Sequence, residues 1–371
     1  MRKRILFLIP NLKPGGAEKV LVNLVNNLDP TKYDITVQTI FDIGIHRDSL
    51  KPHIRYRTVF KRDFRGNNQL FQLFSPEFLW KRMVKEHYDI AISYLEGPTN
   101  RIVSGCCDPD TKRVAWLHTA MDTPKVFSIG FRSPKEAAAR YPRFHRVVAV
   151  SQKAKEHFQS HLTAPCTVDV LYNTNETEQI QQKAQLPIEN PRFPQEGLTV
   201  CSTGKLIPLK GFDRLMSVHK RLLEEGIRHK VCILGIGEEQ KALERQIQQL
   251  GVQDSFLLLG YQTNPYQYVA NSDLYVCAST REGFSTAVTE ALVVGTPVVS
   301  TDVSGARELL GERDEYGLVV ENSEDGIYQG MKRMLSDPAL LAHYKEKAKE
   351  RGSFFSRTET VKAVEAMLDA L

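Results

Sequence analysis

Two glutamates eight positions apart are the residues of this chain best suited to chemistry. Glu282 and Glu290 lie in the run REGFSTAVTEAL at 281–292, where a loop is expected to pass into a helix. Peptide N–H groups at a helix start carry partial positive charge and favour phosphate oxygens, while carboxylates accept hydrogen bonds from sugar hydroxyls. The pattern therefore predicts a site for a sugar joined to a diphosphate. The residues expected at its helix start are Phe284, Ser285 and Thr286.

The two glutamates are expected to divide the work. Glu282 precedes the helix and is suited to sugar hydroxyls, whereas Glu290 lies within it and is suited to a ribose diol. The alternative, two surface glutamates, is disfavoured because Glu290 is set among apolar residues and a buried carboxylate needs a partner.

Two lysines occupy a second loop that is suited to phosphate. Lys205 and Lys210 lie in the segment GKLIPLKGF at 204–212, between an expected strand at 198–202 and an expected helix at 212–225. Cations held there would neutralise a departing diphosphate, and such stabilisation contributes several kcal/mol. Solvated loop lysines are the open alternative.

The first half of the chain offers two further candidates. Gly16, in the segment GGAE at 15–18, follows the first expected strand and opens a helix, so its backbone can approach a phosphate or sugar, although an ordinary tight turn fits equally well. The G-x-G-x-x-G fingerprint is absent there, which disfavours a nicotinamide or flavin. His118 ends the expected strand at 113–117, where a structural histidine is the alternative.

A basic segment runs from Lys51 to Arg65 and contains one acid, Asp63. Aromatic residues then recur near helical spacing from Phe71 to Trp80. We interpret the segment as a surface for anionic lipid, with an ordinary core face as the alternative for the aromatics. Nucleic acid fits poorly because no recognition motif accompanies the charge. The basic residues assigned to this patch are Arg55, Arg57, Lys61, Arg62 and Arg65.

Strand-like and helical patterns alternate along the chain, which is typical of α/β folds with parallel sheets. The Pro-punctuated stretch 185–194 separates two such sets and is expected to be a linker. The prediction is two doubly wound domains, 1–190 and 191–355. Because ligands bind at the carboxyl ends of parallel strands, two facing domains would enclose a cleft.

Composition places the chain in the globular class, with 42% apolar residues in a length of 371 and no apolar run near the ~20 needed to cross a membrane. Six cysteines without metal or disulfide spacing are typical of a reducing cytoplasm. The basic start MRKR mimics a signal peptide, but a first buried strand explains it better. The segment DPD at 108–110 resembles a metal motif of another fold, yet lies in a polar turn.

Together these segments resemble retaining glycosyltransferases of family 4, which have the GT-B fold of two facing Rossmann-like domains. The similarity rests above all on Glu282 with Glu290, the E-x7-E motif of that family. The resemblance implies that Lys205 and Lys210 hold the diphosphate, Glu290 the ribose, Glu282 the donor sugar, and His118 the sugar or reaction centre. It implies no metal or other cofactor, and a C-terminal helix at 356–371 that crosses back onto the first domain.

The expected function is transfer of a hexose or N-acetylhexosamine, with retention, from a nucleotide diphosphate sugar to a lipid-linked saccharide. By resemblance, the nucleotide is UDP and the product a capsule or other surface polysaccharide. The expected location is cytoplasmic and peripheral on the inner face of the cell membrane. The alternatives are a sugar-nucleotide epimerase of similar fold and a noncatalytic sugar-binding protein.

Overall fold

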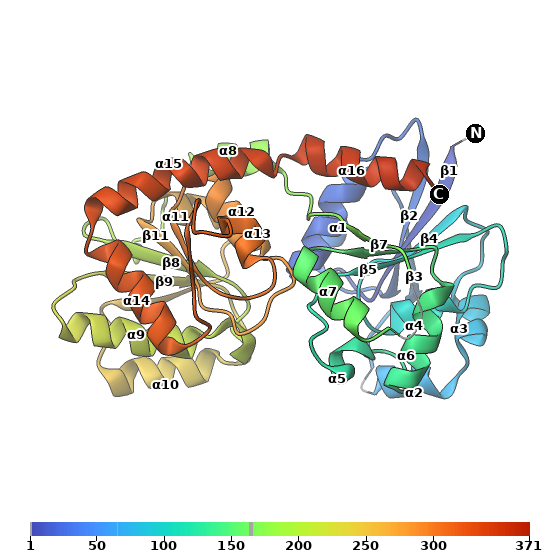
Figure 1. The fold of residues 1–371 in the computed structure, drawn as a ribbon, viewed down its shortest axis with the longest axis horizontal. Helices are drawn as coiled ribbons and strands as arrows, with labels where there is room; N and C mark the ends of the chain where they lie inside the picture. The colour runs from blue at the N-terminus through green and yellow to red at the C-terminus, as the bar shows by residue number, and fades with distance from the viewer. Residues whose placement is uncertain (1, 65, 163–165) are drawn as a thin grey trace. The chain divides into compact units, whose positions relative to one another are not determined.

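The computed structural model describes residues 2–64, 66–162 and 166–371. The chain forms two compact units, Met1–Asn175 with Arg357–Leu371, and Glu176–Ser356 (Figure 1). Each unit is a parallel sheet covered by helices on its faces, so the predicted α/β class with two Rossmann-like domains is confirmed. Among the described residues, no helix is long and apolar enough to cross a membrane.

The sheet of the first unit has strand order β3-β2-β1-β4-β5-β6-β7, and all its pairings are parallel. Its central strand β1 is buried from Ile5 to Ile9, which explains why that run is continuously apolar. The strands are β1 (Lys3–Ile9), β2 (Tyr33–Phe41), β3 (Arg55–Phe60), β4 (Ile90–Ser93), β5 (Lys112–Leu117), β6 (Arg146–Ala149) and β7 (Val168–Val170).

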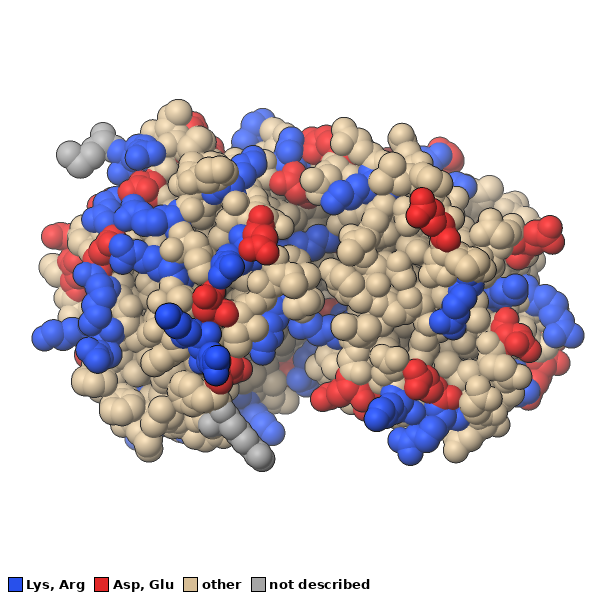
Figure 2. Space-filling model, turned by 180° about the vertical axis from the view of Figure 1, so that it is seen from behind, with Lys and Arg blue, Asp and Glu red and all other residues tan. Residues whose placement is uncertain are grey.

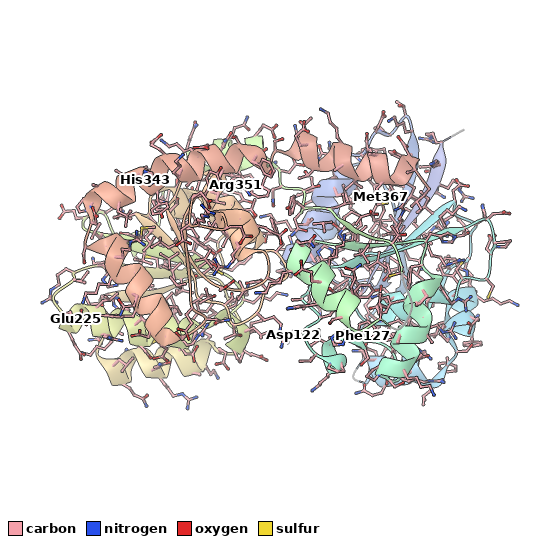
Figure 3. The ribbon with its side chains drawn as sticks, in the orientation of Figure 1. Asp122, Phe127, Glu225, His343, Arg351 and Met367 are labelled. Carbon is pink, nitrogen blue, oxygen red and sulfur yellow. The ribbon has the colours of Figure 1, made fainter. Side chains whose placement is uncertain are left out.

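Several helices of the first unit begin with proline, which has a preset φ and no N–H that would need a partner there. Ser75 and Ser133 cap two of them through their hydroxyls. Phe127 lies in the core that these helices cover, with Tyr141 and Phe158 beside it (Figure 3). The helices are α1 (Gly16–Asn27), α2 (Asn67–Leu73), α3 (Pro76–Met83), α4 (Pro98–Ser104), α5 (Pro124–Phe127), α6 (Pro134–Arg140) and α7 (Gln152–Ser160), with the 3-10 turns η1 (Ile45–Ser49) and η2 (Tyr141–Arg143).

The C-terminal helix α16 (Arg357–Asp369) belongs to the first unit. The Tyr33 hydroxyl donates to Oδ1 of Asp369 at 2.6 Å, and the backbone N–H of Asp29 donates to Oε1 of Glu365 at 2.8 Å. The chain therefore returns to the unit in which it started, as expected for this helix.

The second unit has strand order β10-β9-β8-β11-β12-β13, again entirely parallel. Its strands are β8 (Thr199–Thr203), β9 (Lys230–Leu234), β10 (Phe256–Gly260), β11 (Leu274–Cys277), β12 (Val298–Thr301) and β13 (Leu318–Val320). Its helices are α8 (Thr177–Ala184), η3 (Pro208–Lys210), α9 (Phe212–Glu224), α10 (Gln240–Leu250), α11 (Tyr266–Ala270), α12 (Thr286–Val293), α13 (Ala306–Leu310), α14 (Glu324–Leu335) and α15 (Pro338–Phe354).

The division between the units lies at Asn175–Glu176, earlier than the predicted boundary at 190. The physical reason is α8, whose Ile180 packs with Tyr266 and Val293 of the second unit. The stretch 185–194 is therefore part of the second unit and not a linker.

Candidate active site

The loop that follows β8 is shaped by two glycines. A Cβ on Gly235, whose φ is +153°, would lie 1.8 Å from the carbonyl oxygen of Gly204. A Cβ on Gly204 would lie 3.2 Å from Cε of Lys210. Only residues without side chains allow the ends of β8 and β9 to approach this closely while Lys210 folds over them.

This loop is tied to the one that follows β11. The Thr280 N–H donates to the carbonyl of Leu209 at 2.8 Å. A Cβ on Gly211 would lie 2.2 Å from the carbonyl oxygen of Ala278, and Arg214 donates to that oxygen at 2.5 Å. The two loops therefore form one rigid edge at the carboxyl ends of adjacent strands β8 and β11.

Lys210 and Glu282 meet at this edge. The Lys210 ammonium lies 2.6 Å from Oε1 of Glu282, and the Ser279 hydroxyl donates to the same oxygen at 2.7 Å. The Thr301 hydroxyl donates to the carbonyl of Ser279 at 2.6 Å and fixes its position. Burial opposes the charged form of Lys210, but attraction to Glu282 outweighs it and raises the pKa of the lysine. A charged ammonium and a carboxylate therefore lie side by side in fixed positions.

Lys205, predicted to share the phosphate with Lys210, is on the same loop but is exposed, and no described residue pairs with it. The Lys205 ammonium is therefore more accessible to water than that of Lys210.

The predicted helix start after Glu282 is present as α12, and the structure adds a side-chain cap at Ser285. The Ser285 hydroxyl accepts from the N–H of Val288 at 3.4 Å, and the Thr289 hydroxyl donates to the Ser285 carbonyl at 3.0 Å. Thr286 is the first helical residue and is half-buried. Glu290 lies further along α12 and is partly exposed rather than enclosed by its apolar neighbours.

The Phe284 side chain is not available to a ligand, which leaves only the backbone contact that the sequence predicted. Its ring is 5% exposed and packs against Phe355 with ring centroids 5.7 Å apart. A Cβ on Gly305 would lie 2.8 Å from the Phe284 ring, so this side chain fills the interior. Any ligand contact at this position therefore belongs to the backbone.

A groove of about 370 Å³ lies in the same unit. Leu206 and Gly235 of the β8 and β9 ends line it, as do Gly260 at the end of β10 and Gln240 and Glu244 of α10. Its volume is within the range of small-ligand sites. No sequence pattern indicated this groove, because its walls come from three separated segments.

In the first unit, Gly16 begins α1 and is exposed, as a backbone contact site requires. The preceding Gly15 is close to Glu18, since a Cβ on Gly15 would lie 2.2 Å from Oε2 of that carboxylate. The glycine pair therefore serves local packing at Gly15 and leaves Gly16 open.

His118 follows β5 and rests on aromatic rings. Its ring centroid is 4.8 Å from that of Tyr94, and it is stacked on Trp116 at 6.5 Å. Its Nε2 is shielded from solvent with no hydrogen-bond partner among the described residues. Burial lowers the pKa of His118 to about 3, so the imidazole is neutral at physiological pH. It is suited to hydrogen bonding rather than to carrying positive charge.

Glu96, between β4 and α4, is a candidate that the sequence reasoning missed. Its Oε1 accepts from the backbone N–H of Thr119 at 2.5 Å, next to His118. Burial raises the pKa of Glu96 to about 7, although backbone N–H groups partly offset the effect. The available signal was an acid placed directly after the strand-like run IAISYL at 90–95 and before Gly97.

The predicted basic patch is divided by the structure. Arg55 and Arg57 both pair with Glu86, and Arg55 also pairs with Asp34 at 2.7 Å. Lys61 and Arg62 are exposed, whereas Arg65 lies outside the described residues. Arg55 and Arg57 are therefore paired with acids distant in sequence, although Glu86 is shared with Arg4 as well. Over the first unit as a whole, Lys and Arg still gather on the face seen at the left of Figure 2.

The aromatic residues after this segment also divide. Phe71 is buried in the core, whereas Phe74 and Phe78 are 40% and 51% exposed and stack with centroids 5.1 Å apart. Phe71 therefore fits the interpretation as a core face, whereas Phe74 and Phe78 remain available for a surface contact. The turn at 108–110 pairs Asp108 with His87 at 2.8 Å.

Comparisons with known proteins agree with this architecture. A family model described as Glycosyltransferase Family 4 matches residues 14–179, and one described as Glycosyl transferases group 1 matches residues 186–351. A Campylobacter jejuni protein named N-acetylgalactosamine-N,N'-diacetylbacillosaminyl-diphospho-undecaprenol 4-alpha-N-acetylgalactosaminyltransferase is 36% identical over 223 residues, 59% of this chain and 58% of that protein. The match thus spans little more than half of that relative.

Two further comparisons span nearly the whole chain. An uncharacterized glycosyltransferase of Haemophilus influenzae is 23% identical over 94% of both chains. The crystal structure of Anabaena HepE in complex with UDP and glucose superposes with a TM-score of 0.79 at 21% identity, covering 100% of both chains. The structural likeness establishes a shared fold.

Proposed function

The chain belongs to glycosyltransferase family 4 and has the GT-B fold, and from this premise we propose that it transfers a sugar from a nucleotide diphosphate donor with retention of anomeric configuration. The donor is proposed to be a UDP-hexose or UDP-N-acetylhexosamine. In support, Anabaena HepE, which shares the fold, was crystallised as a complex with UDP and glucose.

The observation that carries the proposal is the direct contact of Lys210 with Glu282 beside the capped start of α12. A cation next to peptide N–H groups suits diphosphate oxygens, and a carboxylate next to both suits the hydroxyls of the sugar joined to them. A free phosphate would use only the cation and the N–H groups, and a free sugar only the carboxylate, whereas a sugar joined to a diphosphate uses them all.

In the proposed reaction, the acceptor hydroxyl attacks the anomeric carbon on the face from which the diphosphate departs. The bond between the anomeric carbon and the diphosphate oxygen breaks, and the hydroxyl proton passes to that oxygen. Lys210, Lys205 and the N–H groups before α12 stabilise the departing negative charge, a contribution of several kcal/mol. The scheme requires no metal, because these groups supply the positive charge.

The acceptor is proposed to be a lipid-linked saccharide in surface polysaccharide synthesis. The Campylobacter relative carries a diphospho-undecaprenol in its name, and this chain is similar to it over 223 residues. Gly16 and neutral His118 are proposed to contact sugar groups through hydrogen bonds.

The experiment is a thermal-shift panel of nucleotide sugars followed by transfer assays with the best donor. A true donor at 100 times its dissociation constant should stabilise the protein by about 2.7 kcal/mol. Transfer to an undecaprenyl-diphosphate-linked saccharide with α-to-α retention, seen by NMR of the product, is expected. Absence of both stabilisation and transfer across UDP, GDP and dTDP sugars would refute the proposal.

We further propose that the first unit binds anionic membranes through an apolar edge made of Leu70, Leu73, Phe74 and Phe78, whose side chains are 41%, 72%, 40% and 51% exposed. Lys81 and Arg82 follow Phe78 by one helical turn and lie on the same side of α3, so charge adjoins the apolar surface. Such a combination suits insertion at the headgroup boundary.

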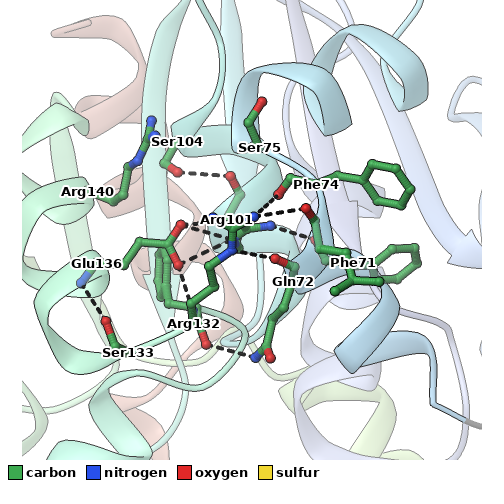
Figure 4. A network of polar contacts seen from close by, with 12 residues as sticks. Phe71, Gln72, Phe74, Ser75, Arg101, Ser104, Arg132, Ser133, Glu136 and Arg140 are labelled. Carbon is green, nitrogen blue, oxygen red and sulfur yellow. Dashed lines mark hydrogen bonds and ion pairs between the residues drawn. The ribbon is translucent and has the colours of Figure 1, made fainter.

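A network of arginine hydrogen bonds holds this edge in place (Figure 4). Arg132 donates to the carbonyls of Gln72 and Leu73 at the end of α2, at 2.5 and 2.9 Å. Fully buried Arg101 donates to the carbonyl of Phe71 at 2.6 Å and pairs with Glu136. The last carbonyls of α2 are thus satisfied by arginines, which keeps Leu73 and Phe74 displayed outward.

Vesicle flotation tests the membrane proposal. The protein should float with vesicles containing phosphatidylglycerol at low salt but not with pure phosphatidylcholine. Leu73→Glu with Phe78→Glu should abolish flotation, whereas Leu186→Glu, at a 52% exposed position of the second unit, should not. Equal flotation of the double variant and the control would refute the assignment.

A further inference from the structure

The turn between β4 and α4 is unusually well fixed for a loop. The carbonyl of Leu95 accepts from the Thr99 hydroxyl at 2.6 Å and from the Ser93 hydroxyl at 3.3 Å. Gly97 has a φ of +117°, and a Cβ on Gly130 would lie 2.0 Å from its carbonyl carbon. Because a neighbouring loop packs directly on its backbone, this turn can serve as a rigid mount for the side chain of Glu96.

From that mount, the Glu96 carboxylate reaches the end of the adjacent strand β5. It accepts from the N–H of Thr119 at 2.5 Å, and the N–H of His118 and the Thr119 hydroxyl also favour its charged form. A carboxylate that collects donors from two successive residues fixes the backbone on which the imidazole is carried.

His118 itself is held by packing on one side and leaves a polar atom unsatisfied. Tyr94 and Trp116 support its ring, while its Nε2 has no partner among the described residues and is hidden from solvent. Tyr94, 0% exposed, and Trp116, 2% exposed, each leave their polar atom without a described partner as well. An imidazole in this setting depends on its backbone anchor for its orientation.

We infer that Glu96 is the positioning residue for His118, holding the imidazole at the carboxyl edge of the first sheet so that it can hydrogen-bond the sugar substrate. The inference deepens the proposed function and rests on it for the identity of the ligand. The ionised carboxylate is the effective form, because a protonated one accepts N–H bonds more weakly.

This arrangement makes activity depend on pH near neutrality. Burial raises the pKa of Glu96 to about 7, so its charge appears as the pH rises through that value. The titratable groups facing it are His118, whose pKa is lowered to about 3 by burial, and Tyr141, whose pKa is raised by burial and by Glu96. Neither changes charge between pH 6 and 8, so neither masks the titration of Glu96, and the Glu96→Gln variant identifies the transition that belongs to it.

The test compares Glu96→Gln with the surface control Glu156→Gln, using the full chain. We expect kcat/KM of Glu96→Gln to fall at least tenfold at pH 8 and its rise through pH 7 to disappear. Its affinity for UDP alone should stay within twofold of that of the unaltered protein. The control should keep the activity and pH profile of the unaltered protein.

A second readout does not need activity. With carbon-13 at Cε1 of histidine, the His118 signal, identified by its absence in His118→Gln, should shift with a midpoint near pH 7 in the natural sequence and not in Glu96→Gln. The inference would be overturned if kcat/KM of Glu96→Gln still rose through pH 7. An identical titration of the His118 signal in both proteins would also overturn it. Failure of the unaltered protein to transfer any sugar would refute the proposed function instead, since the NMR titration stands without it.

Discussion

Lys210 and Glu282 are in contact, with 2.6 Å between Nζ and Oε1, although 71 residues separate them in the sequence. Each comes from the loop after a different strand, and the neighbouring positions of β8 and β11 in the sheet bring those loops together. The pair is 24% and 14% exposed, so water screens it only in part. The consequences of breaking it should therefore be measurable in both stability and binding.

Replacing Lys210 by methionine should lower both the stability of the fold and the affinity for UDP. The substitution leaves the Glu282 carboxylate half-buried with only the Ser279 hydroxyl, and we expect a loss of about 1 to 3 kcal/mol in the free energy of unfolding. Affinity for UDP should fall at least tenfold. Lys205→Met, at an exposed lysine of the same loop, should leave stability unchanged. Urea unfolding and calorimetric titration check the comparison, and equal stability of the two variants would contradict it.

Glu282→Gln should separate nucleotide binding from transfer. Removing the carboxylate leaves the Lys210 ammonium without its counter-charge, so diphosphate binding should be kept or strengthened. Turnover should nevertheless drop at least a hundredfold if the carboxylate orients the donor sugar. Titration with UDP and initial rates with the intact donor give the two quantities. A parallel fall in UDP affinity and turnover would argue against separate roles.

Much of the fold was predictable because burial leaves a direct mark on sequence. Strands such as Ile5–Ile9 and Leu274–Cys277 are covered on both faces and are continuously apolar. The start of α12 after Glu282 was equally predictable. The unit boundary was missed because α8 packs through Ile180, a contact that depends on residues 86 and more positions away.

Side-chain partnerships were the part that sequence could not supply. Arg55 and Arg57 look like free cations in a basic run, yet Glu86 lies beside both once β3 and the segment before β4 are placed. Glu96 follows β4, and its hydrogen-bond donor Thr119 follows β5, so their contact becomes visible only when the two strands are placed side by side. Periodicity in the sequence predicts whether a side chain faces the core or the solvent. Ion pairs and hydrogen bonds between distant segments depend on the order of the strands in the sheet.

Gly235→Ala should damage the β8–β9 end more than its backbone conformation alone explains. Gly235 and Gly226 both have positive φ, +153° and +85°, but a Cβ on Gly226 would meet nothing within 4 Å. Gly226→Ala therefore measures the cost of a positive φ without a steric clash, about 1 kcal/mol. Gly235→Ala adds a clash with the Gly204 carbonyl and should cost at least about 2 kcal/mol more, with lost UDP affinity. Equal unfolding midpoints would contradict this reading.

His219 and His229 form a buried hydrogen-bonded pair in the second unit. The Nδ1 of His229 faces the carbonyl of Ile227 at 3.0 Å and must donate to it, which makes its Nε2 the acceptor for Nδ1–H of His219 at 2.9 Å. The Nε2 of His219 then accepts from the Ser255 hydroxyl at 2.8 Å. The two rings cannot both be charged, because Nδ1–H of His219 and Nε2–H of His229 would then face each other as two donors.

Acid should therefore destabilise the second unit through this pair. Burial, helped by the neighbouring ring, lowers the pKa of His219 to about 3, and burial lowers the pKa of His229. Because both folded values lie below the unfolded value of about 6.5, the full stability is present above pH 6.5 and is lost as the pH falls toward 3. The loss approaches about 1.4 kcal/mol per pH unit for each histidine.

Urea unfolding at pH 7.5, 6 and 5 measures this loss in variants. His229→Gln preserves one acceptor and one donor without titrating, so the pH dependence of its unfolding free energy should be shallower than that of the natural sequence. His343→Gln replaces an exposed histidine of α15 (Figure 3) and should leave the dependence unaltered. If His229→Gln and His343→Gln lost stability equally with acid, the His219–His229 pair would have no part in the loss, because His229 would then contribute no more to it than an exposed histidine does.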